Sequence, residues 1–274
     1  MTNPDKQTPD HNKWDPAQYG KFADERARPA MDLMAQIPLV AALLDGRGQI
    51  IDLGCGAGHQ AAALADRFPM AQVLGIDSSA EMLEQARTTH GETERSRWRE
   101  TPVEDYTPDI APDLIYSNAA LQWVGGHETL FPRLASWLKP GGVLAVQMPN
   151  NFDAPSHQIM RDAADNGPWT TRLAGVRRDF PVRGAAFYYA ALAPHARHLD
   201  IWETTYIHVL EGADPVAQWT KSTGLRPYLS VLKDDAERDA FFEDYAARLR
   251  KAYPPEPDGR TLFPFRRLFM VAVV

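Results

Sequence analysis

The chain has 274 residues, a net charge of −7 and a single cysteine, Cys55. An acidic balance argues against a dedicated nucleic-acid binder, whose phosphate contacts need a basic surface. One cysteine cannot form an internal disulfide, which favours a reducing cytoplasm, and the lack of any run of about 18 apolar residues argues against a membrane span. Residues 1–12 are expected to form a disordered tail.

Helix and strand patterns alternate in the first half of the chain, which predicts a parallel sheet with right-handed crossovers. Short apolar runs predict strands at residues 49–53, 72–77, 97–100, 113–118 and 142–148. Helices are expected at 30–44 with an interruption at Pro38, at 59–68, from the capping box of Ser78 and Glu81 to about Thr89, and at 127–138.

A different pattern follows residue 149. Helices are expected at 156–165, around 187–189, at 214–223 and at 234–253, and strands at 198–208 and 266–274. A final apolar strand after helical insertions fits an α/β fold with a seven-stranded, mostly parallel sheet and an antiparallel last strand. We expect one domain over 13–274, with insertions at about 149–195 and 212–255 that form a helical substrate cap.

The most informative segment is the strand and glycine turn at residues 50–58, followed by Asp77 at the end of the next strand. Gly54, Gly56 and Gly58 allow a tight turn and close approach of a ligand, because glycine has no side chain to clash. The next helix points its amide N–H groups at the ligand, where the carboxylate of a methionine moiety would fit. Asp77 can accept hydrogen bonds from both hydroxyls of a ribose, so the pattern predicts a nucleotide-shaped pocket.

Two classes of enzyme share this arrangement. The nicotinamide fingerprint G-x-G-x-x-G, started at Gly56, meets Gly58 and then Ala61, a permitted variant, so the glycines alone do not exclude a dehydrogenase. Asp52, two residues before Gly54, is unusual for that class. It is usual in the Rossmann-like class I methyltransferases, which this segment resembles, and the resemblance implies S-adenosylmethionine (SAM) as the cofactor.

The resemblance covers most of the chain from Trp14 onward. Its specific part lies outside the glycine turn, in the segments 14–19, 25–29, 75–79, 118–123, 143–149, 200–206 and 223–227. Through them the chain resembles the trans-aconitate methyltransferase family, which implies transfer of a methyl group from SAM to a carboxylate of trans-aconitate, giving a monomethyl ester. The cofactor positions of that fold match Asp52, Gly54, Gly56, Asp77 and Asn118.

Further cofactor contacts are expected at both ends of the pocket. Many relatives place an acidic residue after the third strand, where this chain has Thr101-Pro102-Val103-Glu104. Pro102 has no N–H to donate, so the adenine contact is expected from Thr101, Val103 or Glu104. The remaining expected cofactor contacts are Tyr19, Phe22, Arg26, His59 and Ser78.

The charge of the substrate indicates which residues should bind it. A carboxylate has a reference pKa of about 4 and is already ionised, so no general base or other catalytic side chain is expected. Binding a trianion calls for arginine, whose planar guanidinium holds carboxylates bidentately. The expected substrate contacts are Arg28, Trp123, His127, Tyr188, Arg226 and Tyr228, with core packing as the alternative for several of them. No metal site is expected, because the eight histidines lack metal-ligand spacing.

Other functions fit the same residues. A SAM-dependent methyltransferase for another small acid or an acyl thioester, and a SAM-binding protein without turnover, both stay open. A nucleic-acid methyltransferase is disfavoured, because residues 117–120 read Ser-Asn-Ala-Ala where enzymes for exocyclic amines carry Asn/Asp-Pro-Pro-aromatic. The expected protein is a monomer or small homo-oligomer that acts on a small polycarboxylate and contacts neither nucleic acid nor membrane.

Overall fold

The computed structural model describes residues 23–45, 48–176, 180–221 and 223–274, and the side chains from residue 27 onward within these ranges. The expected tail at 1–12 therefore lies outside the described residues, as do Tyr19 and Phe22. The chain divides into two compact units. The sheet unit comprises the described parts of 26–150, 180–206 and 265–274, and the helical unit comprises the described parts of 1–25, 151–179 and 207–264.

The sheet has seven strands in the order β3-β2-β1-β4-β5-β7-β6. They are β1 (Gln49–Leu53), β2 (Gln72–Asp77), β3 (Ser96–Glu100), β4 (Leu114–Asn118), β5 (Val143–Pro149), β6 (His198–Leu210) and β7 (Thr261–Val273). The first five are parallel, and β7 runs antiparallel to β5. The predicted fold is thereby confirmed.

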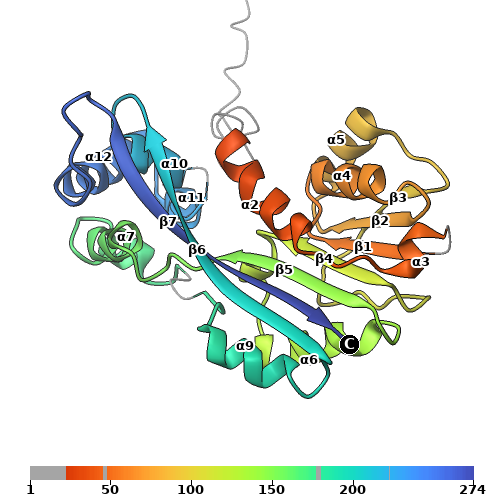
Figure 1. Ribbon diagram of the computed structural model, residues 1–274. Helices are drawn as coiled ribbons and strands as arrows, with labels where there is room; N and C mark the ends of the chain where they lie inside the picture. The colour runs from red at the N-terminus through yellow and green to blue at the C-terminus, as the bar shows by residue number, and fades with distance from the viewer. Residues whose placement is uncertain (1–22, 46–47, 177–179, 222) are drawn as a thin grey trace, which may run out of the picture. The chain divides into compact units, whose positions relative to one another are not determined.

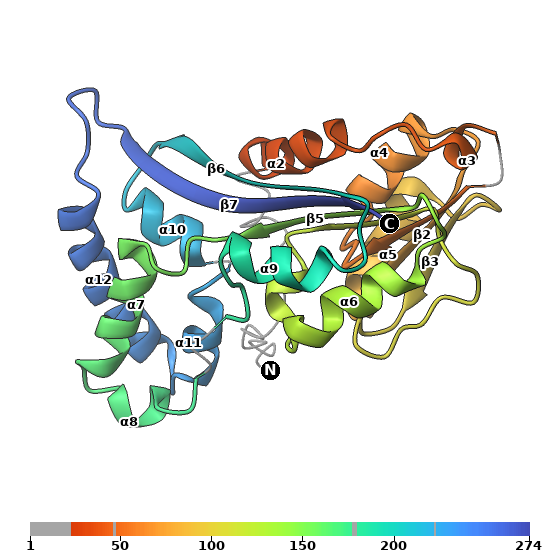
Figure 2. The same cartoon turned by 60° about the horizontal axis from the view of Figure 1, so that its bottom comes forward.

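Helices cover both faces of the sheet, because successive side chains of each buried strand point to opposite sides. Ile50 packs in one core and Ile51 in the other. What we call the α2 face carries α2 (Ala23–Ala35), α3 (Ala41–Leu44), α4 (His59–Arg67) and α5 (Ala80–His90) (Figure 1). The α6 face carries α6 (His127–Trp137) and α9 (Ala185–Leu192), which lie side by side in Figure 2.

The helical unit has its own core. Its helices are α7 (Pro155–Asp165), α8 (Thr170–Leu173), α10 (Pro215–Lys221), α11 (Arg226–Val231) and α12 (Asp235–Ala252). The buried Tyr245 on α12 donates its hydroxyl hydrogen bond to the carbonyl of Ser156 at 3.1 Å, and Trp169 meets Phe241 edge-on at 5.1 Å. These contacts fasten α12 to α7 and to the segment before α8.

Three local expectations differ from the structure. Helix α2 begins at Ala23 and passes through Pro29, whereas a start at residue 30 was predicted; Pro29 removes one N–H, and the buried stripe of Leu33 and Met34 holds the helix in place. Ser79, and not Ser78, caps α5. The segment 180–195, expected in the cap, belongs to the sheet unit, where α9 packs against α6.

Within the described ranges, no helix combines the length and apolar character needed to cross a membrane. The same residues contain no group of three or more His, Cys, Asp or Glu side chains that could hold a metal ion.

Candidate functional site

The glycine turn between β1 and α4 adopts a left-handed backbone at each glycine. The φ angles are +73° at Gly54, +53° at Gly56 and +81° at Gly58, values that side chains with a Cβ rarely adopt. A Cβ on Gly58 would lie 2.5 Å from the Trp98 ring, and one on Gly54 would lie 2.2 Å from Cβ of Ala120. At Gly56 a Cβ would meet only Met82 among the described residues, at 3.4 Å, so this glycine faces the most open space of the three.

The turn is tied to the end of β2. The N–H groups of Gly54 and of the buried Cys55 donate to the carbonyl of Ile76 at 2.8 and 2.9 Å. Asp77 Oδ2 accepts the N–H of Gly56 at 2.8 Å, and its Oδ1 accepts the N–H of Ser79 at 2.9 Å. The second bond places the exposed Ser78 in a turn and moves the helix cap to Ser79. Each carboxylate oxygen of Asp77 retains a lone pair for a ligand hydroxyl.

Two buried oxygens near this turn await a donor. Asp52 is 1% exposed, and its Oδ2 atom has no hydrogen-bond partner among the described residues. Burial raises the pKa of Asp52 to about 8, with a further contribution from Asp77. Asn118 Oδ1, at the end of the adjacent strand β4, likewise has no partner within the described part of the chain. A ligand that carries a cation or N–H donors would satisfy both groups, and the ammonium group of SAM has that chemistry.

The backbone that follows β4 is strained where it approaches the glycine turn. Ala119 has φ of +52°, although it carries a Cβ, and its N–H donates to the carbonyl of Gln147 at 2.9 Å. The next residue, Ala120, is the one that excludes a side chain at Gly54. Strain of this kind concentrates at ligand sites, where the surrounding structure enforces it.

The adenine end of the expected pocket is a turn at residues 102–105, in which Asp105 N–H donates to the carbonyl of Pro102 at 3.2 Å. The N–H of Thr101 already donates to the carbonyl of Asp77 at 3.0 Å, which leaves the amides of Val103 and Glu104 for an adenine. The carbonyl of the buried Val103 accepts from Arg133 at 3.3 Å.

His59 opens α4, as predicted. Its exposed ring places Nδ1 3.2 Å from Nε2 of His90, whose own ring lies beside Trp98. In this position the ring flanks the turn, while the expected contact with the cofactor stays a prediction.

Arg28 lies on α2 and meets the sheet at Tyr206. Its guanidinium carbon is 5.4 Å from the centre of the Tyr206 ring, and its Nε atom is 3.8 Å from Asp32 Oδ2. The Tyr206 hydroxyl donates to the same Asp32 oxygen at 2.7 Å. The Arg28 side chain is 73% exposed and therefore accessible to an anion. Arg26 lies on the same helix, but its side chain is outside the described residues.

Trp123, His127 and Tyr188 gather on the α6 face. Trp123 is 47% exposed and meets Phe180 edge-on at 5.3 Å. His127 and Tyr188 are both buried. The Tyr188 hydroxyl donates to His127 Nδ1 at 2.8 Å, and His127 Nε2 donates to the carbonyl of Leu121 at 2.9 Å. Burial lowers the pKa of His127. Neither side chain can offer a hydrogen bond to a ligand without first breaking this pair.

Arg226 and Tyr228 belong to the helical unit. Arg226 is the half-buried first residue of α11, and its N–H donates to the carbonyl of Thr223 at 3.1 Å. Tyr228 is buried and stacks on Phe241 with 6.0 Å between ring centres. The expected cofactor residues that the structure describes belong to the sheet unit, whereas these two expected substrate residues belong to the other unit.

Two residues at the carboxyl end of the sheet were not predicted from the sequence. Gln147 on β5 and Arg267 on β7 are both buried, and Arg267 Nη1 donates to Gln147 Oε1 at 3.5 Å. The signal available was a pair of arginines, Arg266 and Arg267, in an otherwise apolar strand.

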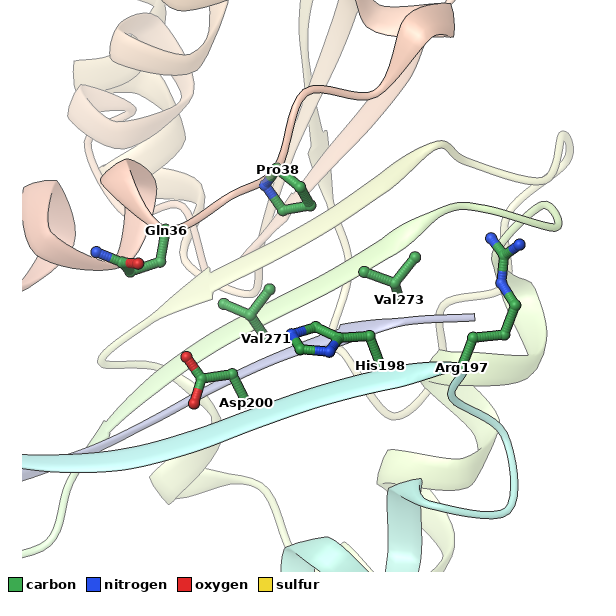
Figure 3. Close-up of a pocket in the computed structure, with 7 residues that line it drawn as sticks. All are labelled: Gln36, Pro38, Arg197, His198, Asp200, Val271 and Val273. Carbon is green, nitrogen blue, oxygen red and sulfur yellow. The ribbon is translucent and has the colours of Figure 1, made fainter.

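An open groove of about 420 Å³ lies elsewhere in the sheet unit. Figure 3 shows its lining: the end of α2 at Gln36, the start of β6 at His198 and Asp200, and the end of β7 at Val273. Val273 pairs with Val143, the first residue of β5, so the groove is at the amino ends of the parallel strands. Ligands of open parallel sheets bind at the opposite, carboxyl ends, where the glycine turn lies.

Comparison with known proteins agrees with this geometry. A family described as a methyltransferase domain matches residues 50–142. A trans-aconitate 2-methyltransferase from Azoarcus sp. (strain BH72) is 50% identical, over 95% of this chain and 98% of its own length. One from Yersinia pestis (strain Pestoides F) is 47% identical, over 94% and 97%.

Solved structures share the fold at low sequence identity. The YcgJ protein from Bacillus subtilis is 16% identical and superposes with a TM-score of 0.56, over 90% of this chain and 98% of its own. Geranyl diphosphate C-methyltransferase from Streptomyces coelicolor A3(2), a complex that contains S-adenosyl-L-homocysteine, is 15% identical with a TM-score of 0.51, over 97% and 84%.

Proposed function

Because this chain belongs to the trans-aconitate 2-methyltransferase family of SAM-dependent methyltransferases, we propose that it methylates a carboxylate of trans-aconitate, giving the monomethyl ester. When bound, SAM supplies an electrophilic methyl group on a sulfonium, with S-adenosylhomocysteine as the leaving group. The chain's own residues then have to bind SAM and the acceptor, orient the acceptor carboxylate toward the methyl group and exclude water.

The donor site fits SAM part by part. Asp77 would accept hydrogen bonds from the ribose hydroxyls. The open space at Gly56 would allow SAM to approach the backbone of the glycine turn closely. Asp52 and Asn118 would pair with the ammonium end, which would satisfy two buried oxygens that otherwise lack partners among the described residues. The amide of Val103 or Glu104 would meet the adenine.

No residue is needed as a general base, because the acceptor carboxylate is ionised at neutral pH. The burial of His127 agrees with this, since both nitrogens of its imidazole are already hydrogen-bonded, one to Tyr188 and one to a backbone carbonyl. Arg28 is the arginine of the sheet unit that we propose as a contact of the anionic acceptor, with Trp123 beside the acceptor. The expected contact of Arg226 with the acceptor stays a prediction.

One observation carries the donor assignment: two buried acceptor atoms, Asp52 Oδ2 and Asn118 Oδ1, stand without partners within the described ranges beside a left-handed glycine turn. The test is incubation with SAM labelled in its methyl group and trans-aconitate. We expect a labelled monomethyl ester. Binding of SAM with transfer only to another small acid or an acyl thioester would favour that alternative, and binding without any transfer would favour a non-catalytic SAM-binding protein.

The Asp77→Ala variant serves as the control for the donor site. It should weaken SAM binding in calorimetry, because the ribose loses its carboxylate and the turn loses the bond to Gly56. Intact affinity would contradict the ribose assignment. We further propose a cytoplasmic monomer or small homo-oligomer, for which the mass in solution by light scattering is the measurement.

A further inference from the structure

A row of buried polar side chains crosses four neighbouring strands of the sheet unit. Its members are Asp52 on β1, Asn118 on β4, Gln147 on β5 and Arg267 on β7. Each lies two residues along its strand from a core residue of the α2 face, namely Ile50, Tyr116, Ala145 and Phe269. Side chains two apart share a face of a strand, so the row faces α2.

The register places this row at the carboxyl end of the sheet. Asn118 pairs with Gln147, and Arg267 pairs with Pro149, the last residue of β5. Adjacent strands are about 4.8 Å apart, so Arg267 lies about 10 Å across the sheet from Asn118. The row thus runs from the donor site to Arg267.

Arg267 is a buried cation. It is 4% exposed, its guanidinium carbon lies 4.7 Å from the centre of the Phe265 ring, and it donates to Gln147 Oε1. A guanidinium at such depth is costly unless hydrogen bonds and opposite charge compensate it. The Gln147 Nε2 atom is also buried and has no hydrogen-bond partner in the described part of the chain. The two side chains therefore present N–H donors at one place, which suits a carboxylate.

Tyr206 links this place to α2. Its hydroxyl bonds to Asp32, and Arg28 lies over its ring. Burial and Asp32 raise the pKa of Tyr206, while Arg267 and Arg28 both act to lower it. The centre of the Tyr206 ring is 6.4 Å from that of Phe269, which lies two residues from Arg267 on the same face of β7. Arg28 is exposed and Arg267 is buried, so an anion approaching Arg28 has a second cation deeper in the unit.

We propose that Arg267 and Gln147 Nε2 form a subsite for a carboxylate of the acceptor that is not methylated, with Arg28 at its exposed end. This inference rests on the proposed function. It assigns specificity for polycarboxylates to the sheet unit itself, because a monocarboxylic acid has no second carboxylate to accept hydrogen bonds from Arg267 and Gln147.

The test compares Arg267→Lys with Arg266→Lys, its neighbour on the opposite face of β7, whose Nε donates to the carbonyl of Asn150. Lysine keeps the charge and loses the planar fork. We expect Arg267→Lys to raise the KM for trans-aconitate about 10- to 100-fold while the affinity for S-adenosylhomocysteine stays within about twofold, and Arg266→Lys to change neither by more than about twofold. An unchanged KM in Arg267→Lys, or an equal loss of affinity for S-adenosylhomocysteine, would overturn the subsite.

Three dicarboxylates locate the carboxylate that Arg267 binds. Itaconate, glutaconate and mesaconate each lack a different carboxyl group of trans-aconitate. As inhibitors, two of them should lose affinity in Arg267→Lys and the third should not. Equal effects on all three, or none, would contradict a contact with one carboxylate.

Two measurements keep the subsite separate from folding and from turnover. If Arg267→Lys does not fold, Gln147→Met replaces it, with an expected rise in KM of about 5- to 10-fold and no change in S-adenosylhomocysteine affinity. If the wild-type protein transfers no methyl group to trans-aconitate, the proposed function fails. In that case, calorimetry measures the affinity of the wild-type protein and of Arg267→Lys for trans-aconitate in the presence of S-adenosylhomocysteine. Weaker binding in Arg267→Lys would support the subsite, and equal binding would contradict it.

Discussion

The buried Asp52 lowers the free energy of unfolding at high pH, although its carboxyl group is proposed to bind the ligand. Its carboxyl group is buried, and the pKa rises from 3.8 to about 8, chiefly through burial. Between these pH values the unfolded chain releases a proton that the folded protein retains. The contribution of Asp52 to stability therefore falls as the pH rises from about 4 to about 8.

Asp52→Asn should remove this part of the pH dependence and raise the free energy of unfolding at pH 8, because no charge then has to be buried. The same variant should bind SAM at least about tenfold more weakly, since the ammonium group loses its carboxylate. Thermal unfolding from pH 4 to 8 and calorimetric titration with SAM measure the two effects. The exposed Asp200→Asn serves as control, and undiminished SAM affinity would remove Asp52 from the site.

Gly58 tests why the turn needs glycine. Gly58→Ala should destabilise the protein by about 2–4 kcal/mol, because alanine is strained at φ of +81° and its Cβ would meet Trp98 at 2.5 Å. Gly91→Ala is the matched control: φ is +73° there, and a Cβ would have no described atom within 4 Å. It should cost only the backbone strain, about 1–2 kcal/mol. Equal losses in denaturant unfolding would mean that Trp98 does not restrict the turn.

At the scale of elements, α6 and α9 are joined by a polar bond inside an apolar layer. The Tyr188 hydroxyl bonds to His127 and accepts the N–H of Arg183 at 3.1 Å. Tyr188→Phe leaves both groups without this partner.

We expect Tyr188→Phe to lower the free energy of unfolding by about 1–3 kcal/mol without changing kcat or KM by more than about twofold. Thermal unfolding and steady-state kinetics provide the readouts. Tyr189→Phe, at the adjacent position where the residue is 61% exposed, should change neither. A raised KM with unchanged stability would instead make Tyr188 a substrate contact.

The elements also show what the sequence can and cannot reveal. Strands β1 and β2 were predictable because apolar runs end at glycines or at Asp77, and their bounds match the expected ones. The start of α2 was not, since Pro29 suggests a boundary while the helix is held by packing on the sheet. The cap of α5 shifted by one residue because Asp77, outside the helix, takes the N–H of Ser79.

Contacts between distant residues explain what could not be read from spacing. His127 and Tyr188 are 61 residues apart, and Gln147 and Arg267 are 120 apart. The first pair was expected near the substrate because its members carry suitable chemistry, yet only the fold shows that they pair with each other. Arg267 could not be assigned from the sequence, because it follows Arg266 in an otherwise apolar strand, and only the sheet register places it beside Gln147.

At the scale of the whole molecule, the chain divides into two compact units. The donor turn, Arg28 and Arg267 belong to the sheet unit, and Arg226 belongs to the helical unit.

Arg226→Ala should raise the KM for trans-aconitate about 10-fold, because one charge-assisted bond to the trianion is lost. SAM affinity should stay within about twofold, since Arg226 is not among the residues proposed to bind SAM. Kinetics and calorimetry measure the two quantities, with Lys251→Ala as a control that removes an exposed cation from the same unit. Unchanged kinetics would exclude Arg226 from acceptor binding.

Cys55 occupies the middle of the turn that we propose holds an alkylating agent. A thiolate there would be a competing nucleophile for the electrophilic methyl group. Burial raises the pKa of the Cys55 thiol far above its usual value, and Asp52 and Asp77 raise it further. The burial and the two aspartates that the proposed donor site requires therefore also favour the protonated form of the neighbouring sulfur, which is the less nucleophilic one.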